Sequence, residues 1–199
     1  MIRWSRRIAS PNAAIDLDLS EVRRVMAELE NTKEEIGGAT TKALRRTASA
    51  LRVMASKRLT SELQIRKAME LRKRMKDMKL RVKSDGSAVM GMWFGLNDMG
   101  VSKFKGRIRK TPAGASFRGV EYPGTFVAKM AEDRPLSIYK RRGRDRFPVV
   151  EQTLPIKDQA DVIIKDEIFP EATRIFMKNL LHELRYRARL RAEKAARDG

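Results

Sequence analysis

The spacing of hydrophobic residues changes twice along this chain, and that change constrains the fold more than any other feature. Towards the N-terminus, apolar residues recur every three or four positions, the period of an amphipathic helix. Between about residues 78 and 154 they form short runs separated by turn residues, which indicates strands. The helical period returns from about residue 161 or 166 and continues to residue 196. Because strands and helices do not alternate, the order predicts an α+β fold: N-terminal helices, a central antiparallel β-sheet and a long C-terminal helix.

Local signals predict where the N-terminal helices begin. Ser20 has the residue type of an N-cap and precedes a short apolar pattern. Thr32 and Glu35 have the spacing of a capping box, which predicts the start of a second helix. A stripe on one side of this second helix contains Leu44, Thr47, Ala48, Leu51, Met54 and Ala55. A further, basic helix is predicted around residues 64–75.

The middle of the chain predicts a β-hairpin followed by several short strands. Met78, Leu80 and Val82 alternate with basic residues, and an apolar run over residues 88–96 follows a turn. Residues 97–119 are rich in Gly, Lys and Arg and are predicted to be a long basic loop, either functional or ordered by a partner. The later strands are expected at about residues 115–121, 125–130, 136–141 and 147–154.

The C-terminal helix contains Pro170, which is expected either in its first turn or at a kink. Its apolar face contains Ile168, Ala172, Ile175, Phe176, Leu180 and Leu184. Beyond Leu184 the helix is rich in Arg, and we expect it to protrude or to dock on another subunit. The predicted organisation is an N-terminal arm (1–19), an α+β domain (20–165) that includes the basic loop, and the C-terminal helix with its basic extension (166–199).

The net charge indicates that the chain binds a polyanion or an acidic partner protein. The chain has 44 Lys and Arg residues against 25 Asp and Glu residues, a formal net charge of +19. The charge lies in blocks of opposite sign: residues 16–35 and 158–171 are acidic, whereas residues 42–83 are strongly basic. Such blocks suit a subunit that binds copies of itself as well as a polyanion. Eight charged residues are candidate subunit contacts: Glu28, Glu30, Glu34, Glu35, Asp166, Glu167, Arg185 and Arg189.

Several classes of protein are disfavoured by the residues present. The chain has no Cys, so disulfides and thiolate metal sites are excluded. No apolar run approaches the ~20 residues that span a bilayer, and the N-terminus does not resemble a signal peptide, so we expect no membrane partner and a cytoplasm-like compartment. His182 has no partner acid or nucleophile in any catalytic spacing, and it is interpreted as a surface or subunit-contact residue. We therefore expect no enzyme activity, no cofactor and no metal.

Two basic clusters, over residues 103–110 and 140–146, leave two interpretations open. They form sequence-independent, salt-sensitive contacts with phosphates, or they are solvated faces and salt bridges between subunits. Few aromatic residues that could stack on bases lie among these basic residues: at most Phe104, Phe117 and Tyr139. The candidate DNA or partner contacts are Lys103, Lys105, Arg107, Arg109, Lys110, Arg141, Arg142 and Arg144.

A resemblance to a known family centres on residues 122–154. Three successive strand segments there read Tyr-Pro-Gly-Thr-Phe-Val (122–127), Ile-Tyr-Lys-Arg-Arg-Gly (138–143) and Arg-Asp-Arg-Phe-Pro-Val (144–149). Together with the long C-terminal helix and the upstream basic helices, they resemble the bacteriophage minor tail protein Z family over roughly residues 20–190. The family more often has Ala where this chain has Thr125, and residues 1–15 have no counterpart in it.

The resemblance implies a function. Proteins of that family complete the head-proximal end of the tail, enable head–tail joining, build rings and have no catalytic residues. The expected location is therefore the virion, at its tail or neck, after assembly in the host cytoplasm. The expected partners are copies of the chain in a ring, other tail or neck proteins, and packaged DNA through non-specific contact. The alternative function is non-specific nucleic-acid binding by a free protein.

Overall fold

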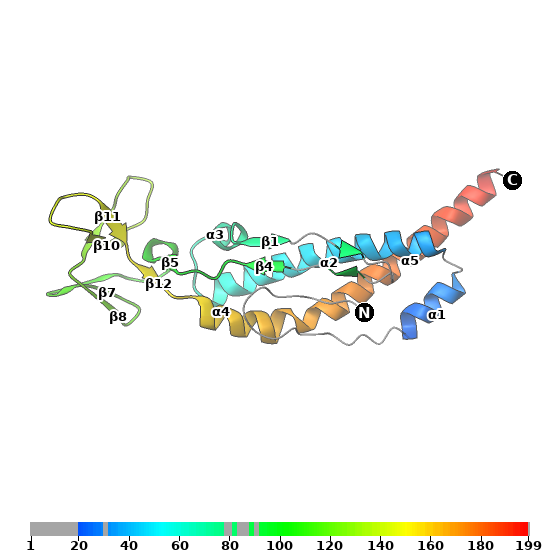
Figure 1. Ribbon diagram of the computed structural model, residues 1–199, viewed down its shortest axis with the longest axis horizontal. Coiled ribbons are helices and arrows are strands. Elements are labelled where there is room, and N and C mark those ends of the chain that lie inside the picture. Colours follow the sequence, from blue (N-terminus) through cyan, green and yellow to red (C-terminus); the bar gives the residue numbers. More distant parts are fainter. Residues whose placement is uncertain (1–19, 30–31, 78–80, 83–87, 90–91, 199) are drawn as a thin grey trace. The chain divides into compact units, whose positions relative to one another are not determined.

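A computed structural model describes residues 20–29, 32–77, 81–82, 88–89 and 92–198 (Figure 1). The chain divides into two compact units, each built from separate stretches of sequence. Unit 1 comprises residues 1–55, 72–94 and 164–199, and unit 2 comprises residues 56–71 and 95–163. The C-terminal helix belongs to the same unit as the N-terminal helices.

Unit 1 is built on helices α1 (Ser20–Glu28), α2 (Lys33–Glu62, as far as residue 55) and α5 (Pro170–Asp198). The predicted capping box is confirmed at the start of α2. The Thr32 amide donates to Glu35 Oε2 at 2.9 Å, and the Glu35 amide donates to Thr32 Oγ1 at 3.2 Å. These two bonds satisfy amide groups that have no partner within the helix, so α2 begins where the local sequence predicts.

The predicted apolar faces of α2 and α5 form the core of unit 1. The two helices run side by side (Figure 1), and Asn179 Nδ2 of α5 donates to Thr47 Oγ1 of α2 at 3.0 Å. Fully buried side chains from these faces include Leu44, Ala48, Leu51, Ala55, Ala172, Phe176 and Leu184. Met54 and Ile175 lie at the edges of this contact and are half-buried. The helical periodicity therefore predicted correctly which sides of the helices meet.

Pro170 occupies the first turn of α5. Ahead of it, α4 (Lys157–Ile163) is followed by a π-helical turn, Ile164–Ile168, in which the Phe169 amide donates to the Ile164 carbonyl at 3.0 Å. Proline has no amide hydrogen and its ring clashes with the carbonyl four residues earlier, so the α-helical hydrogen bonding cannot continue through it. Of the two predicted positions for Pro170, the first turn is confirmed.

The predicted hairpin of unit 1 is present in the described residues. Strand β1 (Met75–Asp77) pairs antiparallel with β4 (Met92–Phe94), and β2 (Arg81–Val82) pairs with β3 (Ala88–Val89). Met78 and Leu80, on which the prediction partly rested, lie outside the described residues. The basic helix expected around residues 64–75 is wrong in extent, since α3 covers only Ala68–Arg72. After α2 the chain turns at Gln64, which has a φ of +53°. The first strand pairing then begins at Met75.

Unit 2 contains small antiparallel sheets and helix α4. One sheet has the order β6 (Arg109–Thr111), β7 (Gly114–Phe117) and β8 (Val120–Pro123). Another has the order β11 (Val149–Glu151), β10 (Ser137–Arg141) and β9 (Phe126–Ala128). Strands β5 (Met99–Gly100) and β12 (Thr153–Leu154) form a third pair, and a 3₁₀ turn, Val101–Lys103, follows β5. The α+β class is confirmed, but its β-structure is divided among several small sheets.

The expectation of a loop over residues 97–119 is wrong for much of that stretch. Strands β5 and β6 lie in it, and so does β7, which overlaps the strand expected at about residues 115–121 and is hydrogen-bonded on both sides. Gly114 makes the tight return between β6 and β7, with a φ of +152°. A Cβ atom there would lie 2.4 Å from the Tyr122 carbonyl oxygen, so only glycine allows β7 and β8 to approach this closely. Gly114, one of the glycines that suggested a loop, is thus a residue that permits the sheet.

Candidate functional site

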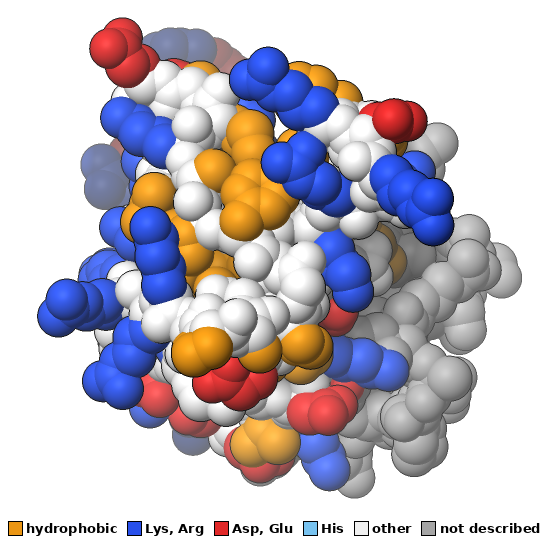
Figure 2. Space-filling view, turned by 90° about the vertical axis from the view of Figure 1, so that its left-hand side faces the viewer, with side chains coloured by type: hydrophobic (Ala, Val, Ile, Leu, Met, Phe, Trp, Pro, Cys, Tyr) orange, Lys and Arg blue, Asp and Glu red, His pale blue; other side chains and the backbone are white. Residues whose placement is uncertain are grey.

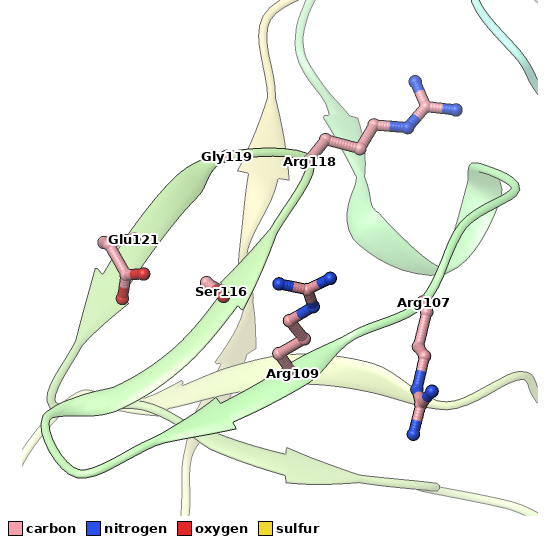
Figure 3. Close-up of a pocket in the computed structure, with 6 residues that line it drawn as sticks. All are labelled: Arg107, Arg109, Ser116, Arg118, Gly119 and Glu121. Carbon is pink, nitrogen blue, oxygen red and sulfur yellow. The ribbon is translucent and has the colours of Figure 1, made fainter.

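The predicted DNA or partner contacts all lie in unit 2, where two of them, Arg107 and Arg109, line one hollow with their side chains pointing in different directions (Figure 3). The hollow has a volume of about 470 Å³ and is lined by Arg107, Arg109, Ser116, Arg118, Gly119 and Glu121. Strand register places Arg109 opposite Ser116 and Ser116 opposite Glu121, in a row across the sheet. Because neighbouring strands are ~4.8 Å apart, the cationic and acidic ends of this row are about 10 Å apart at the backbone.

Arg118 lines the hollow but belongs to the framework of unit 2. Its guanidinium donates to the carbonyls of Leu63 at 3.0 Å, Gln64 at 3.1 Å and Lys105 at 2.8 Å. It also lies 5.1 Å and 5.5 Å from the ring centres of Phe104 and Phe117, and burial lowers the pKa of Arg118. Figure 3 shows it directed away from Arg109. Arg118 therefore fastens the C-terminal end of α2 to the β-sheet, a role that no local sequence signal indicated.

Arg107 and Arg109 differ from Arg118, because both are exposed and neither forms a side-chain hydrogen bond or ion pair with any residue that the structure describes. Lys105 and Lys110 are exposed as well, whereas Lys103 Nζ is paired with Glu70 Oε1 at 2.9 Å. The hollow thus offers two free guanidinium groups and the Ser116 hydroxyl to an anion, with Glu121 at its opposite side.

A second cationic element is the turn between β10 and β11, residues 142–148, which we call the β10–β11 loop. Arg142 and Arg144 are exposed, and Arg141 at the base of the loop lies 5.3 Å from the ring centre of Phe126. Phe147 is 62% exposed, with the Arg146 guanidinium 5.7 Å from its ring centre. On the face of the molecule drawn in Figure 2, Lys and Arg side chains surround exposed hydrophobic ones.

None of the few aromatic residues that the sequence analysis named beside the basic clusters is exposed to a ligand. Phe104, Phe117 and Tyr139 are all buried in unit 2. Phe147, which sequence reasoning did not single out, is the exposed aromatic beside the cations. The signal available was the order of residues 144–149, where a Phe stands between a basic run and a proline and lacks the alternation of a buried strand.

The predicted subunit contacts lie in unit 1 and have different environments. Glu35 is used within the chain, because its Oε2 atom accepts from Arg191 Nη1 at 2.8 Å as well as from the Thr32 amide. Arg189 pairs with Glu193 one turn further along α5, at 2.7 Å. Glu30 lies outside the described residues. The others are exposed: Glu28, Glu34, Asp166, Glu167 and Arg185.

An ion cluster that the sequence did not reveal lies between α2 and α5. Glu183 is only 1% exposed, yet it is an acid on the apolar side of α5. Lys42 Nζ lies 3.0 Å from Glu183 Oε2, and Arg46 approaches Oε1 closely, although neither contact has the geometry of a linear hydrogen bond. Lys42 also lies 5.2 Å from the ring centre of Tyr186. Two half-exposed cations thus compensate one buried carboxylate.

The described part of the chain contains no group of three or more His, Asp or Glu side chains placed to hold a metal ion. His182 is exposed on α5. Within the same described part, no helix has the length and apolar character needed to cross a membrane. No family model, curated protein or solved structure matches the chain.

Proposed function

We propose that the chain is a non-enzymatic structural protein of a tailed-phage virion, which completes the head-proximal end of the tail as a ring and enables head–tail joining. The observation that supports this most is the placement of the three family-like segments. They fall on the end of β8 and on β9, on β10 and on the β10–β11 loop with the start of β11, and the chain then ends in the long helix α5. The resemblance implies this same succession of elements.

The partners in this proposal are copies of the chain, neighbouring tail or neck proteins, and packaged DNA. Acidic residues on unit 1 supply one side of a subunit contact, since Glu28 and Glu34 are exposed. The basic residues of unit 2 supply charge of the opposite sign. A contact between two different patches joins subunits head to tail, and such contacts close into a ring when the rotation between subunits closes.

Removing the gene from the genome that encodes the chain tests the proposal. We expect electron micrographs of the resulting lysate to show heads and tails that are not joined, and a copy of the gene supplied in trans to restore joined particles. Particles that remain joined and infectious without the protein would contradict the proposed role.

Charge reversal tests the ring. We expect sedimentation to show self-association of the unaltered chain, a Glu28→Lys/Glu34→Lys variant to lose it, and a Lys178→Glu variant to retain it. The first variant leaves the capping box at Thr32 and Glu35 intact, so its helices should form normally. Equal self-association of both variants and the unaltered chain would exclude these acids from the contact.

A second candidate function, non-specific nucleic-acid binding, is favoured by the free cations of unit 2. Arg107, Arg109, Arg142 and Arg144 have no side-chain partner among the described residues. Such cations bind phosphates with an affinity that falls steeply as salt rises. Duplex binding by the isolated protein at 50 and 200 mM salt, followed by fluorescence anisotropy, tests this function, and salt-independent binding or none would exclude it.

A further inference from the structure

We propose that the β10–β11 loop binds single-stranded nucleic acid, with an unpaired base stacked on the ring of Phe147 and the adjacent phosphates bound by Arg142 and Arg144. This inference rests on the second candidate function and names both its ligand and its site. It also goes beyond a structural role in a virion, because it assigns a binding surface to one loop.

The exposure of Phe147 is the first observation. Its side chain is 62% exposed, whereas Phe94, Phe104, Phe117 and Phe176 are at most 6% exposed. An apolar ring exposed to water is stabilised when another flat surface covers it. The guanidinium of Arg146, 5.7 Å from the ring centre, leaves most of the ring surface free.

The loop is already ordered, which is the second observation. The Arg142 amide donates to the Pro148 carbonyl at 3.1 Å, and Arg141 Nη1 donates to the Arg146 carbonyl at 3.2 Å. Arg141 is itself held against the ring of Phe126. Because these contacts fix both ends of the loop, a ligand meets Phe147 in a set position and little conformational entropy is lost on binding.

The charge around the ring is the third observation. Residues 140–146 contain five cations and one acid, Asp145. Four of the five cations are arginines, whose planar guanidinium groups suit phosphate oxygens. Lys140, Arg142 and Arg144 are exposed and have no side-chain hydrogen bond or ion pair within the described part of the chain. An anionic ligand therefore gains new ion pairs without breaking existing ones.

An exposed aromatic ring surrounded by arginines favours single strands over other anionic partners. Proteins that bind single strands without sequence preference combine a cationic surface with aromatic rings on which bases stack. In a duplex, both faces of every internal base are already stacked, so the ring has no surface to cover. An acidic peptide would pair with the arginines, but its carboxylates would not stack on the exposed ring.

Binding of a fluorescent 15-nucleotide oligothymidylate and of a duplex of equal length, measured by anisotropy with the full chain, tests the proposal. We expect Phe147→Leu to weaken single-strand binding about tenfold and to leave duplex binding nearly unchanged. The control is Val120→Ala, which alters another exposed apolar residue of unit 2 and should change neither. Unchanged single-strand binding by Phe147→Leu, or an equal loss for both ligands, would overturn the stacking contact.

Charge and stacking are separated by a second pair of variants. Arg142→Gln/Arg144→Gln should weaken the binding of both ligands and lower the salt dependence by about two phosphate contacts. Arg24→Gln/Arg45→Gln removes the same charge from exposed positions of unit 1 and should have a smaller effect. Equal effects of the two double variants would show that overall charge, not the loop, binds the phosphates, and would overturn the assignment.

Tryptophan at position 147 reports directly on stacking. Phe147→Trp should bind the oligothymidylate at least as tightly as the unaltered chain, and its added fluorescence should be quenched on binding, after subtraction of the signal from Trp4 and Trp93. A blue shift with phosphatidylserine vesicles but no quenching by the oligonucleotide would overturn the proposal in favour of a membrane surface. If the unaltered chain binds duplex but Phe147→Trp shows no quenching, the second candidate function survives and the stacking site does not.

Discussion

The two units use the same kinds of charged side chain in different ways. In unit 1, charges are paired across α2 and α5: Glu183 with Lys42 and Arg46, and Glu35 with Arg191. In unit 2, Arg107, Arg109, Arg142 and Arg144 have no side-chain partner among the described residues. The comparison shows that a high net charge does not mean that all the charge is available to a partner. Three cations of unit 1 help to hold two helices together, and these four arginines of unit 2 are presented to solvent.

The pairing in unit 1 follows the helical repeat. Asn179, Glu183, Arg187 and Arg191 are four residues apart and so lie on one side of α5. Their contacts on α2 occur in the reverse order, from Thr47 through Arg46 and Lys42 to Gly38 and Glu35. This reverse order is that of two antiparallel helices. The polar contacts therefore fix the register of α2 against α5, beside the apolar core that supplies most of the burial.

The largest expected effect comes from breaking the buried ion cluster of unit 1. Glu183→Ala removes the one acid between two cations and leaves a cavity, so we expect a loss of about 3 kcal/mol of stability. The value lies at the low end for a buried pair, since Lys42 and Arg46 are 46% and 44% exposed. Urea unfolding measures it. Glu193→Ala, which breaks an exposed pair on the same helix, is the control and should leave stability nearly unchanged.

Arg118 tests the comparison between paired and unpaired charges within unit 2, because it is a cation of that unit that does have partners. Arg118→Ala removes a donor from three carbonyls, of which that of Gln64 keeps the Lys105 amide, and leaves two rings without a cation, so we expect a loss of about 2 kcal/mol in the same unfolding measurement. Arg107→Ala, at the same hollow, should change stability by less than ~0.5 kcal/mol. Equal effects of the two substitutions would mean that the contacts of Arg118 do not stabilise the fold.

Two adjacent glycines in α2 test how tightly the helices of unit 1 meet. A Cβ atom at Gly37 would have no neighbour within 4 Å, so Gly37→Ala should stabilise the protein by about 0.5–1 kcal/mol through helix propensity alone. A Cβ atom at Gly38 would lie 2.7 Å from Arg187 Nη2, so Gly38→Ala gains less because that guanidinium must move. Thermal unfolding of both variants measures the difference, and equal melting temperatures would show that Arg187 does not press on α2.

The smallest expected effect is on the alkaline stability of unit 2. Burial raises the pKa of Tyr122, and burial together with the Glu151 carboxylate raises the pKa of Tyr139 against a smaller opposing effect of Arg134. A raised pKa means that folding favours the neutral phenol. The resulting stability is fully present below the unfolded pKa of about 10 and is lost as pH rises through the folded pKa. Stability curves from pH 8 to 11 should fall less steeply for Tyr122→Phe/Tyr139→Phe than for the unaltered chain, and parallel curves would contradict the shifts.

Much of the fold was predictable because its signals are local. The capping box involves residues three positions apart, and the missing amide hydrogen of Pro170 limits that residue to the first turn or a kink, of which the structure has the first turn. The loop predicted over residues 97–119 failed because the same glycines suit a loop and a close strand approach, and only the partner strand distinguishes the two. For the candidate site, the sequence indicated two basic clusters but could not tell Arg118, which has partners, from Arg107 and Arg109, which have none among the described residues.

The sequence by itself determined the α+β class, the basic character and the sides of α2 and α5 that are buried, since residue spacing and type are enough for these. The tertiary structure decided which charges are neutralised. Glu183 meets Lys42 and Arg46 across about 140 positions of sequence, and Arg118 meets carbonyls more than 50 positions away. An ion pair depends on a few ångströms of distance in the fold, which sequence spacing over such separations does not encode. The exposure of Phe147 was decided in the same way, by what the surrounding strands leave uncovered.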